Sequence, residues 1–95
     1  MTQAQEQEFR RFLEGVIWQG RPLTAQAVAA RIAKVKQAEE VLGVDIETIV
    51  ATDVTMRLAL MALRSDDAHG NRANAVRKYF EMRRGYEFPR IRDLV

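Results

Sequence analysis

Cysteine is absent from this sequence of 95 residues, and histidine occurs only once, as His69. Without cysteine the chain has no disulfide, no thiol nucleophile and no thiolate ligand for zinc. A single histidine also excludes the metal motifs that need two histidines. The lack of cysteine is compatible with the reducing cytoplasm, where we expect the protein to be located. We therefore expect no metal site and no thiol chemistry.

Long hydrophobic segments are missing as well. No apolar run approaches the roughly 18 residues that indicate a membrane span. The N-terminal stretch is polar and acidic, unlike a secretory signal or a transit peptide. We expect no contact with a membrane.

Patterns typical of an active site are not found. The sequence has no Gly-rich phosphate loop, no nucleophile elbow and no dinucleotide fingerprint. Asp66 and Asp67 lack the spacing of an EF-hand, and their place before a helix start is explained by the helix dipole. His69, beside a glycine in a polar loop, is interpreted as an ordinary loop residue. We predict a protein that is not an enzyme and that has no catalytic residues and no cofactor.

Hydrophobic residues make up 47% of the chain, which is enough for one folded domain over residues 1–95. They recur at three- and four-residue spacing, the pattern of amphipathic helices. Four main helices are predicted, at about residues 3–17, 24–42, 52–64 and 71–84. The expected fold is a compact all-α domain of these helices and a short connector turn.

Capping residues mark the expected helix ends, because a side-chain oxygen satisfies the first free amides and a glycine accommodates the turn after the last residue. The predicted N-caps are Thr2, Thr24, Asn71 and, for the third helix, Thr52 or Asp53. The predicted stops are Gly20, Gly43 and Gly85. We expect Gly85 in the left-handed conformation.

The connecting segments are harder to interpret. Segment 44–50 is predicted to form a single helical turn capped by Asp45. A β-strand is the competing interpretation, but no second strand candidate is seen to pair with it. Residues 21–22 are expected to be an extended connection. Trp18 is expected to pack at the end of the first helix, with binding of a base or a partner as the alternative.

The helix at 52–64 is apolar on nearly all sides. Val54, Leu58 and Met61 fall opposite a second apolar set, which comprises Met56, Leu60 and Leu63. A helix of this kind is typical of the middle of a domain. We therefore predict that it is the central packing element, with the other helices laid against it.

Positive charge is concentrated near the C-terminus. Residues 1–70 hold eight basic and ten acidic side chains, whereas residues 71–95 hold seven basic and three acidic ones, so the net charge of +2 divides into −2 and +4. In the last helix Ala73, Val76, Tyr79 and Phe80 form a stripe that is expected to face the core. The cations around this stripe indicate a nucleic-acid contact, or simply a solvated basic face.

Short motifs in this order resemble the core-binding, SAM-like N-terminal domain of tyrosine recombinases and phage integrases, over about residues 9–84. The motifs are Leu23-Thr24, Leu42-Gly43, Val44-Asp45-Ile46, Thr52-Asp53, Asn71-Arg72 and Ala75-Val76-Arg77-Lys78-Tyr79-Phe80. The chain departs from the family where His69-Gly70 replace a threonine, and the gap between the last two motifs is about one residue shorter. These 95 residues leave no room for the family's catalytic domain, so Tyr79 and Tyr86 inherit no catalytic role.

The resemblance implies an orthogonal SAM-like bundle that holds duplex DNA through basic residues on its long helices. Matched by position, these residues are Arg31, Lys34, Arg72, Arg77 and Lys78. Arg84 is added on the charge argument alone. The expected function is a non-catalytic DNA-binding module that contacts mainly phosphates.

A protein-interaction module, or homodimer, is the competing hypothesis. Its contact patch would comprise Trp18, Tyr86, Phe88 and the tail, although Tyr86, Phe88 and Ile91 are also expected to strap the tail onto the core. DNA binding that weakens with salt would favour the first hypothesis. Self-association that a change at Trp18 blocks would favour the second.

Overall fold

Residues 1–65 and 70–90 are described in the computed structural model of the chain, and they contain five helices and one small sheet. The elements are α1 Gln3–Glu14, β1 Ile17–Trp18, β2 Arg21–Pro22, α2 Ala25–Leu42, α3 Ile46–Ile49, α4 Asp53–Leu63 and α5 Asn71–Arg84. The Cα radius of gyration is 12.6 Å, close to the roughly 12 Å of a compact domain of this length. The all-α prediction is confirmed, with α3 as the connector turn. None of the described helices has the length and hydropathy of a membrane span.

Local capping contacts define most of the helix starts, as predicted. The hydroxyls of Thr2, Thr24 and Thr52 each accept a hydrogen bond from the backbone N–H three residues later, at 3.1, 3.1 and 3.0 Å. Asp45 caps α3 in the same way, at 2.9 Å. Gly43 ends α2 with a φ of 69°, in the left-handed region. Because these contacts involve residues close in sequence, they could be read from the sequence.

The start of α5 differs from the prediction. Gly70, rather than Asn71, is the N-cap, with a φ of 69°, and no side chain caps this helix. Asn71 is the first helical residue, so its side chain lies on the helix surface instead of over the first amides. Asn71 is thereby free to contribute to the surface that α5 shares with α2.

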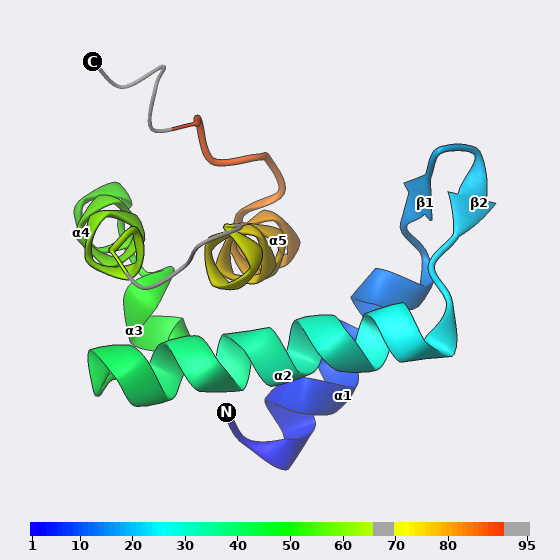
Figure 1. Cartoon of the computed structure of the whole chain (residues 1–95), viewed down its shortest axis with the longest axis horizontal. Helices are drawn as coiled ribbons and strands as arrows, with labels where there is room; N and C mark the ends of the chain where they lie inside the picture. Colours follow the sequence, from blue (N-terminus) through cyan, green and yellow to red (C-terminus); the bar gives the residue numbers. More distant parts are fainter. Residues whose placement is uncertain (66–69, 91–95) are drawn as a thin grey trace.

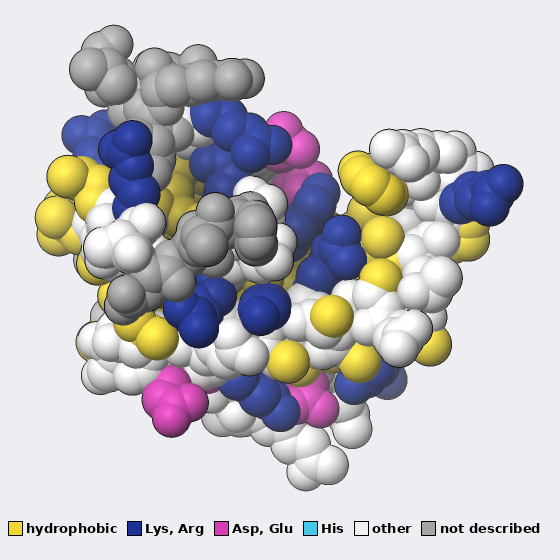
Figure 2. All heavy atoms as spheres, in the orientation of Figure 1, with side chains coloured by type: hydrophobic (Ala, Val, Ile, Leu, Met, Phe, Trp, Pro, Cys, Tyr) yellow, Lys and Arg dark blue, Asp and Glu magenta, His cyan; other side chains and the backbone are white. Residues whose placement is uncertain are grey.

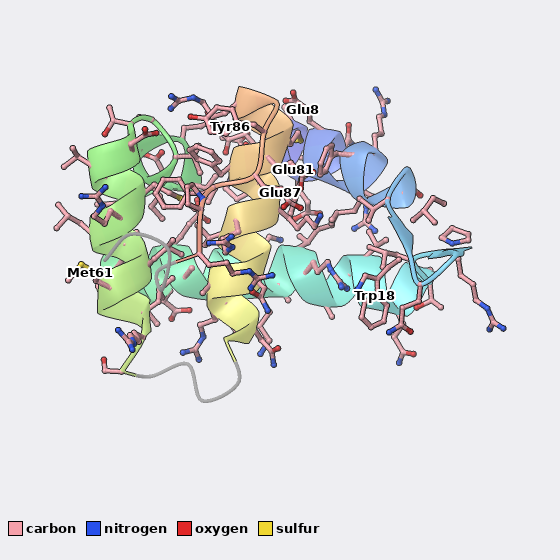
Figure 3. All side chains as sticks on the ribbon, turned by 90° about the horizontal axis from the view of Figure 1, so that it is seen from above. Glu8, Trp18, Met61, Glu81, Tyr86 and Glu87 are labelled. Atoms are coloured by element: carbon pink, nitrogen blue, oxygen red, sulfur yellow. The ribbon has the colours of Figure 1, made fainter. Side chains whose placement is uncertain are left out.

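The central helix is α2, and the prediction that the helix at 52–64 is central is wrong. α2 packs against α1, α4 and α5, whereas α4 lies at one edge of the bundle (Figure 1). Seen from above, α4 and α5 lie side by side across α2 (Figure 3). Val54, Leu58 and Met61 on α4 are 65%, 61% and 57% exposed, and Met61 points away from α5 (Figure 3). No described element covers this face of α4.

A β-hairpin stands where the sequence was expected to continue the first helix. α1 ends at Gly15, and β1 pairs antiparallel with β2 across the two-residue turn Gln19-Gly20. Both turn residues have positive φ, 53° and 77°, as the type I′ hairpin turn requires. Ile17 is 65% exposed instead of buried. The prediction of a helix to Ile17 is wrong, because Gly15 ends the helix before the hairpin begins. Segment 44–50 does form the predicted helical turn, although the chain also holds a pair of strands that the sequence analysis did not find.

Aromatic side chains of α5 form much of the core, as predicted. Val76, Tyr79 and Phe80 are fully buried, and the Phe80 ring meets the ring of Phe88 edge-on, with centroids 5.1 Å apart. Phe88 is itself buried, so it straps the tail onto the core and is not available to a contact patch. Tyr86 is half exposed. The third expected strap residue, Ile91, lies outside the described residues.

A polar cluster holds the C-terminal half of α5 against α1 and α3. Arg83 donates to Glu47 Oε1 at 2.8 Å and to the Tyr79 hydroxyl at 3.0 Å, and it also binds Glu8. The hydrogen bond from Arg83 lowers the pKa of the Glu8 carboxyl below its usual value. Burial, and donation to Glu47, raise the pKa of the Tyr79 hydroxyl. Arg83 is therefore engaged within the fold and is not a candidate for binding nucleic acid.

Gly85 ends α5 in the left-handed conformation, with a φ of 81°, as predicted. We expect Gly85→Val to lower the free energy of unfolding by about 1–2 kcal/mol, since a β-branched residue is strained at positive φ. The space around a Cβ at this position is open, so the effect comes from the backbone alone. Gly15→Ala is the matched control, because Gly15 caps α1 with a φ of −89° and its added Cβ meets only an ordinary contact. Urea unfolding measures both variants, and equal stability of the two would contradict the expectation.

Candidate nucleic-acid interface

Two neighbouring hollows with shared lining residues lie where α5 crosses α2. The first, of about 260 Å³, is lined by Ala30, Arg31, Lys34, Asn71, Asn74 and Ala75. The second, of about 240 Å³, is lined by Trp18, Arg31, Asn74, Arg77, Lys78, Glu81, Glu87, Phe88 and Arg90. Because Arg31 and Asn74 line both hollows, we treat the two together and call them the basic groove. Figure 2 shows Lys and Arg side chains gathered over this part of the molecule, beside the projecting hairpin.

Helical spacing explains why these side chains share one groove. On α5, Asn71, Asn74 and Lys78 follow one another at intervals of three and four residues, so they lie on one face. On α2, Arg31 and Lys34 are three residues apart and lie beside the buried stripe. The groove therefore follows directly from how two amphipathic helices cross.

Three of the groove's cations have only weak local partners among the contacts that can be described. Arg31 donates to the Ala27 carbonyl of its own helix at 3.3 Å, and Lys34 contacts Gln37 Oε1 at 3.4 Å. Lys78 forms a surface pair with Glu81 at 2.9 Å, one turn further along α5. Partly solvated local contacts of this kind contribute little to stability, so these cations can exchange their partners for a phosphate.

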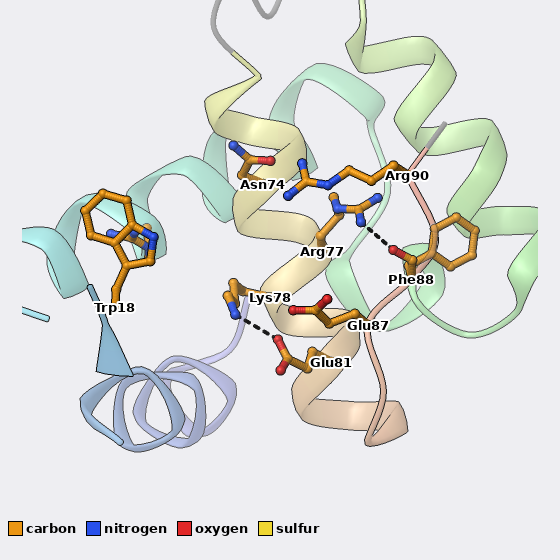
Figure 4. A pocket seen from close by; sticks show the side chains of 9 residues that line it. Trp18, Asn74, Arg77, Lys78, Glu81, Glu87, Phe88 and Arg90 are labelled. Atoms are coloured by element: carbon orange, nitrogen blue, oxygen red, sulfur yellow. Dashed lines mark hydrogen bonds and ion pairs between the residues drawn. The ribbon is translucent and has the colours of Figure 1, made fainter. Parts of the chain in front are cut away.

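Arg77 and Arg72 have structural roles as well. Arg77 donates to the backbone carbonyls of Phe88 and, at 3.0 Å, Pro89, so it fixes the tail beside α5. Figure 4 shows Arg77 next to Arg90 on one side of the second hollow. Arg72 donates to Gln37 Oε1 at 3.1 Å, where α5 meets α2 next to the groove. Both cations add positive potential to this surface while they hold these contacts.

Arg84 lies elsewhere. Its guanidinium donates to the carbonyls of Val50 and Ala51 at 3.3 and 3.1 Å and lies 5.2 Å above the Phe80 ring. Asp53 Oδ1 is 3.8 Å away. The structure thus brings Arg31, Lys34, Arg77 and Lys78 together in the groove and places Arg72 beside it. Arg84, the residue chosen on charge alone, joins the end of α5 to the segment between α3 and α4.

Residues that sequence reasoning did not assign to the site also line the groove. Asn74 could have been found from its position four residues before Lys78 on α5. Trp18 lies on the opposite wall from α5 (Figure 4), and its position depends on a hairpin that was not predicted. Arg90 reaches the groove only because the tail folds back over α5. The sequence predicted that Phe88 holds the tail on the core, but it did not indicate that Arg90 would then line the groove.

The described residues contain no group of three or more histidine, cysteine, aspartate or glutamate side chains placed to hold a metal ion. The groove is lined by cations, amides, two carboxylates and one indole, groups that can bind anions and flat rings. No protein-family model, curated protein or solved structure matches the chain.

Proposed function

We propose that this chain is a non-catalytic, cytoplasmic DNA-binding module that holds duplex DNA mainly through its phosphates. The observation that carries the proposal is the basic groove, which gathers cations from two helices and from the tail into one surface. Arginine and lysine provide most of the phosphate contacts in protein–DNA complexes, and such contacts set position rather than sequence preference.

The remaining groove side chains fit this assignment. Asn71 and Asn74 can donate amide hydrogens to phosphate or sugar oxygens, as asparagine commonly does at such interfaces. Ala30 and Ala75 line the groove with small side chains, which lets a backbone come close. The resemblance of the sequence motifs to recombinase core-binding domains supports the same class of ligand.

The test is a titration of the protein against two unrelated duplexes, followed by fluorescence anisotropy at 50 and 200 mM salt. Each cation–phosphate contact releases counterions, so affinity should fall steeply as salt rises, and by the same factor for both duplexes. A preference for one duplex would indicate base readout. If neither duplex is bound at 50 mM salt, the proposal is wrong.

A second candidate function, self-association, is favoured by the uncovered face of α4. Val54, Leu58 and Met61 form a continuous apolar face, and exposed apolar patches commonly mark protein interfaces. A twofold pair uses the same patch on both copies.

Sedimentation across a range of protein concentrations tests this candidate. We expect Leu58→Glu to abolish any dimer, because it places a charge at the centre of the patch. Val44→Glu, which changes an exposed valine outside α4, is the control and should leave the dimer intact. A parent protein that remains monomeric at every concentration would rule the candidate out.

A further inference from the structure

Trp18 lies at the edge of the basic groove rather than in the core. It is 60% exposed, and it lines the second hollow of the basic groove opposite the cations and amide of α5 (Figure 4). The hairpin that carries it projects from the helical body (Figure 1). An exposed tryptophan does not contribute the core stability that usually accounts for this residue, so its position calls for another role.

The hairpin limits how far Trp18 can move. Trp18 pairs with Arg21 across the two strands, directly next to the tight Gln19-Gly20 turn. A two-residue turn of this type fixes the register of the strands, and successive side chains point to opposite faces. The indole is therefore held on one side of the hairpin, at the edge of the groove.

The two halves of the groove differ in chemistry. The first hollow is lined by Arg31, Lys34 and small or amide side chains, with no acid among its described residues, which suits a phosphate. The second hollow adds three further cations, but it also adds Trp18 and the carboxylates of Glu81 and Glu87, which the first hollow lacks. Carboxylates repel a phosphate but accept hydrogen bonds from the amino groups of bases, and an indole offers a flat face on which a base can stack.

We propose that the second hollow receives one unpaired base, stacked on Trp18, while the first hollow holds the phosphates next to it. This inference rests on the proposed function and narrows its substrate class to DNA that contains an unpaired nucleotide. The volume of about 240 Å³ is below the range of about 300–1,000 Å³ typical of small-molecule sites, and it suits a single base rather than a base pair.

Trp18 is the only tryptophan in the chain, so its intrinsic fluorescence reports on any ligand that reaches this side chain. The experiment titrates the protein with an intact duplex and with the same duplex carrying one unpaired nucleotide. We expect the DNA with the unpaired nucleotide to bind roughly 5- to 150-fold more tightly than the intact duplex, the gain in affinity that base–aromatic stacking supplies. We also expect it to quench the fluorescence of Trp18.

Variants on the hairpin separate stacking from other effects. Trp18→Leu should lose the preference for the unpaired nucleotide while keeping its affinity for the intact duplex, and Trp18→Phe should restore part of the preference. Ile17→Ser, at an equally exposed neighbour on the opposite face of the strand, should keep the full preference. Circular dichroism on each variant confirms that the helices are intact.

The outcomes are distinguishable. Equal binding of the two DNAs by the parent would overturn the stacking inference and leave the proposed function standing. A loss in Trp18→Leu that is equal on both DNAs would also overturn the inference, because Trp18 would then act as a general contact. Absence of binding to either DNA at 50 mM salt would overturn the inference and the proposed function together.

Discussion

Phe80→Ala is expected to lower the free energy of unfolding by about 3–5 kcal/mol, as other large-to-small aromatic changes in cores do. Phe80 is fully buried, and its ring meets Tyr86 and Phe88 edge-on at centroid distances of 5.4 and 5.1 Å. The Arg84 guanidinium lies over the same ring. Removing the ring therefore leaves a cavity where α5, the tail and the segment before α4 all meet.

Thermal unfolding followed by circular dichroism measures this effect. For a domain of this size each 1 kcal/mol shifts the melting temperature by roughly 4–8 °C, so the variant should melt at least about 12 °C below the parent. Tyr86→Ala is the matched control, because Tyr86 contacts the same ring but is half exposed, and its edge contact contributes only about 0.5–1.5 kcal/mol. A Phe80→Ala protein that melts with the parent would show that α5 does not pack through this face.

The largest expected effect on binding comes from neutralising the groove. Changing Arg31, Lys34 and Lys78 together to glutamine should weaken binding to unrelated duplexes alike and reduce the dependence of log affinity on log salt by about 2.7. Between 200 and 50 mM salt the affinity of the parent should then rise about 40-fold more than that of the variant. These three cations are chosen for substitution because their described contacts within the protein are weak. Arg77 and Arg84 are left unchanged because each holds backbone carbonyls.

A charge-matched variant provides the control for that experiment. Arg10, Arg11 and Arg57 lie on α1 and α4 and do not line the groove. Changing these three to glutamine lowers the net charge by the same amount, so a general charge effect would weaken both variants equally. The proposal requires the groove variant to be clearly the weaker binder at 50 mM salt. Both variants should melt close to the parent, since substitutions at partly or fully exposed positions outside the core change stability little.

Contacts between residues close in the sequence were the most predictable part of the fold. Thr24, Asp45 and Thr52 cap their helices as expected, and Gly43 and Gly85 end theirs in the left-handed conformation. Each of these features depends on a few neighbouring residues. The hairpin also has a local signal in the sequence, a glycine in the second position of its tight turn. The helical spacing of apolar residues across 9–17 nevertheless predicted a helix through the first strand.

The candidate site was only partly predictable for a related reason. Periodicity placed Arg31 and Lys34 together on one helix and Lys78 on another, but it could not show that the two helices cross there. Arg84 has the same charge and lies on the same helix, yet it packs over Phe80 at the far end. Trp18 and Arg90 join the groove through a hairpin and a tail whose directions depend on packing.

By itself the sequence determined that this chain folds into helices, where most of them begin and end, and which stripe of α5 is buried. Those properties follow from backbone capping and from hydrophobic spacing, which act over a few residues. Only the tertiary structure decided that α2 is central, that one face of α4 is left uncovered and that Trp18 stands across the basic groove. These features depend on which helices pack against one another, and those helices are far apart in the chain. α4 has two apolar faces, and the other described helices bury only one of them.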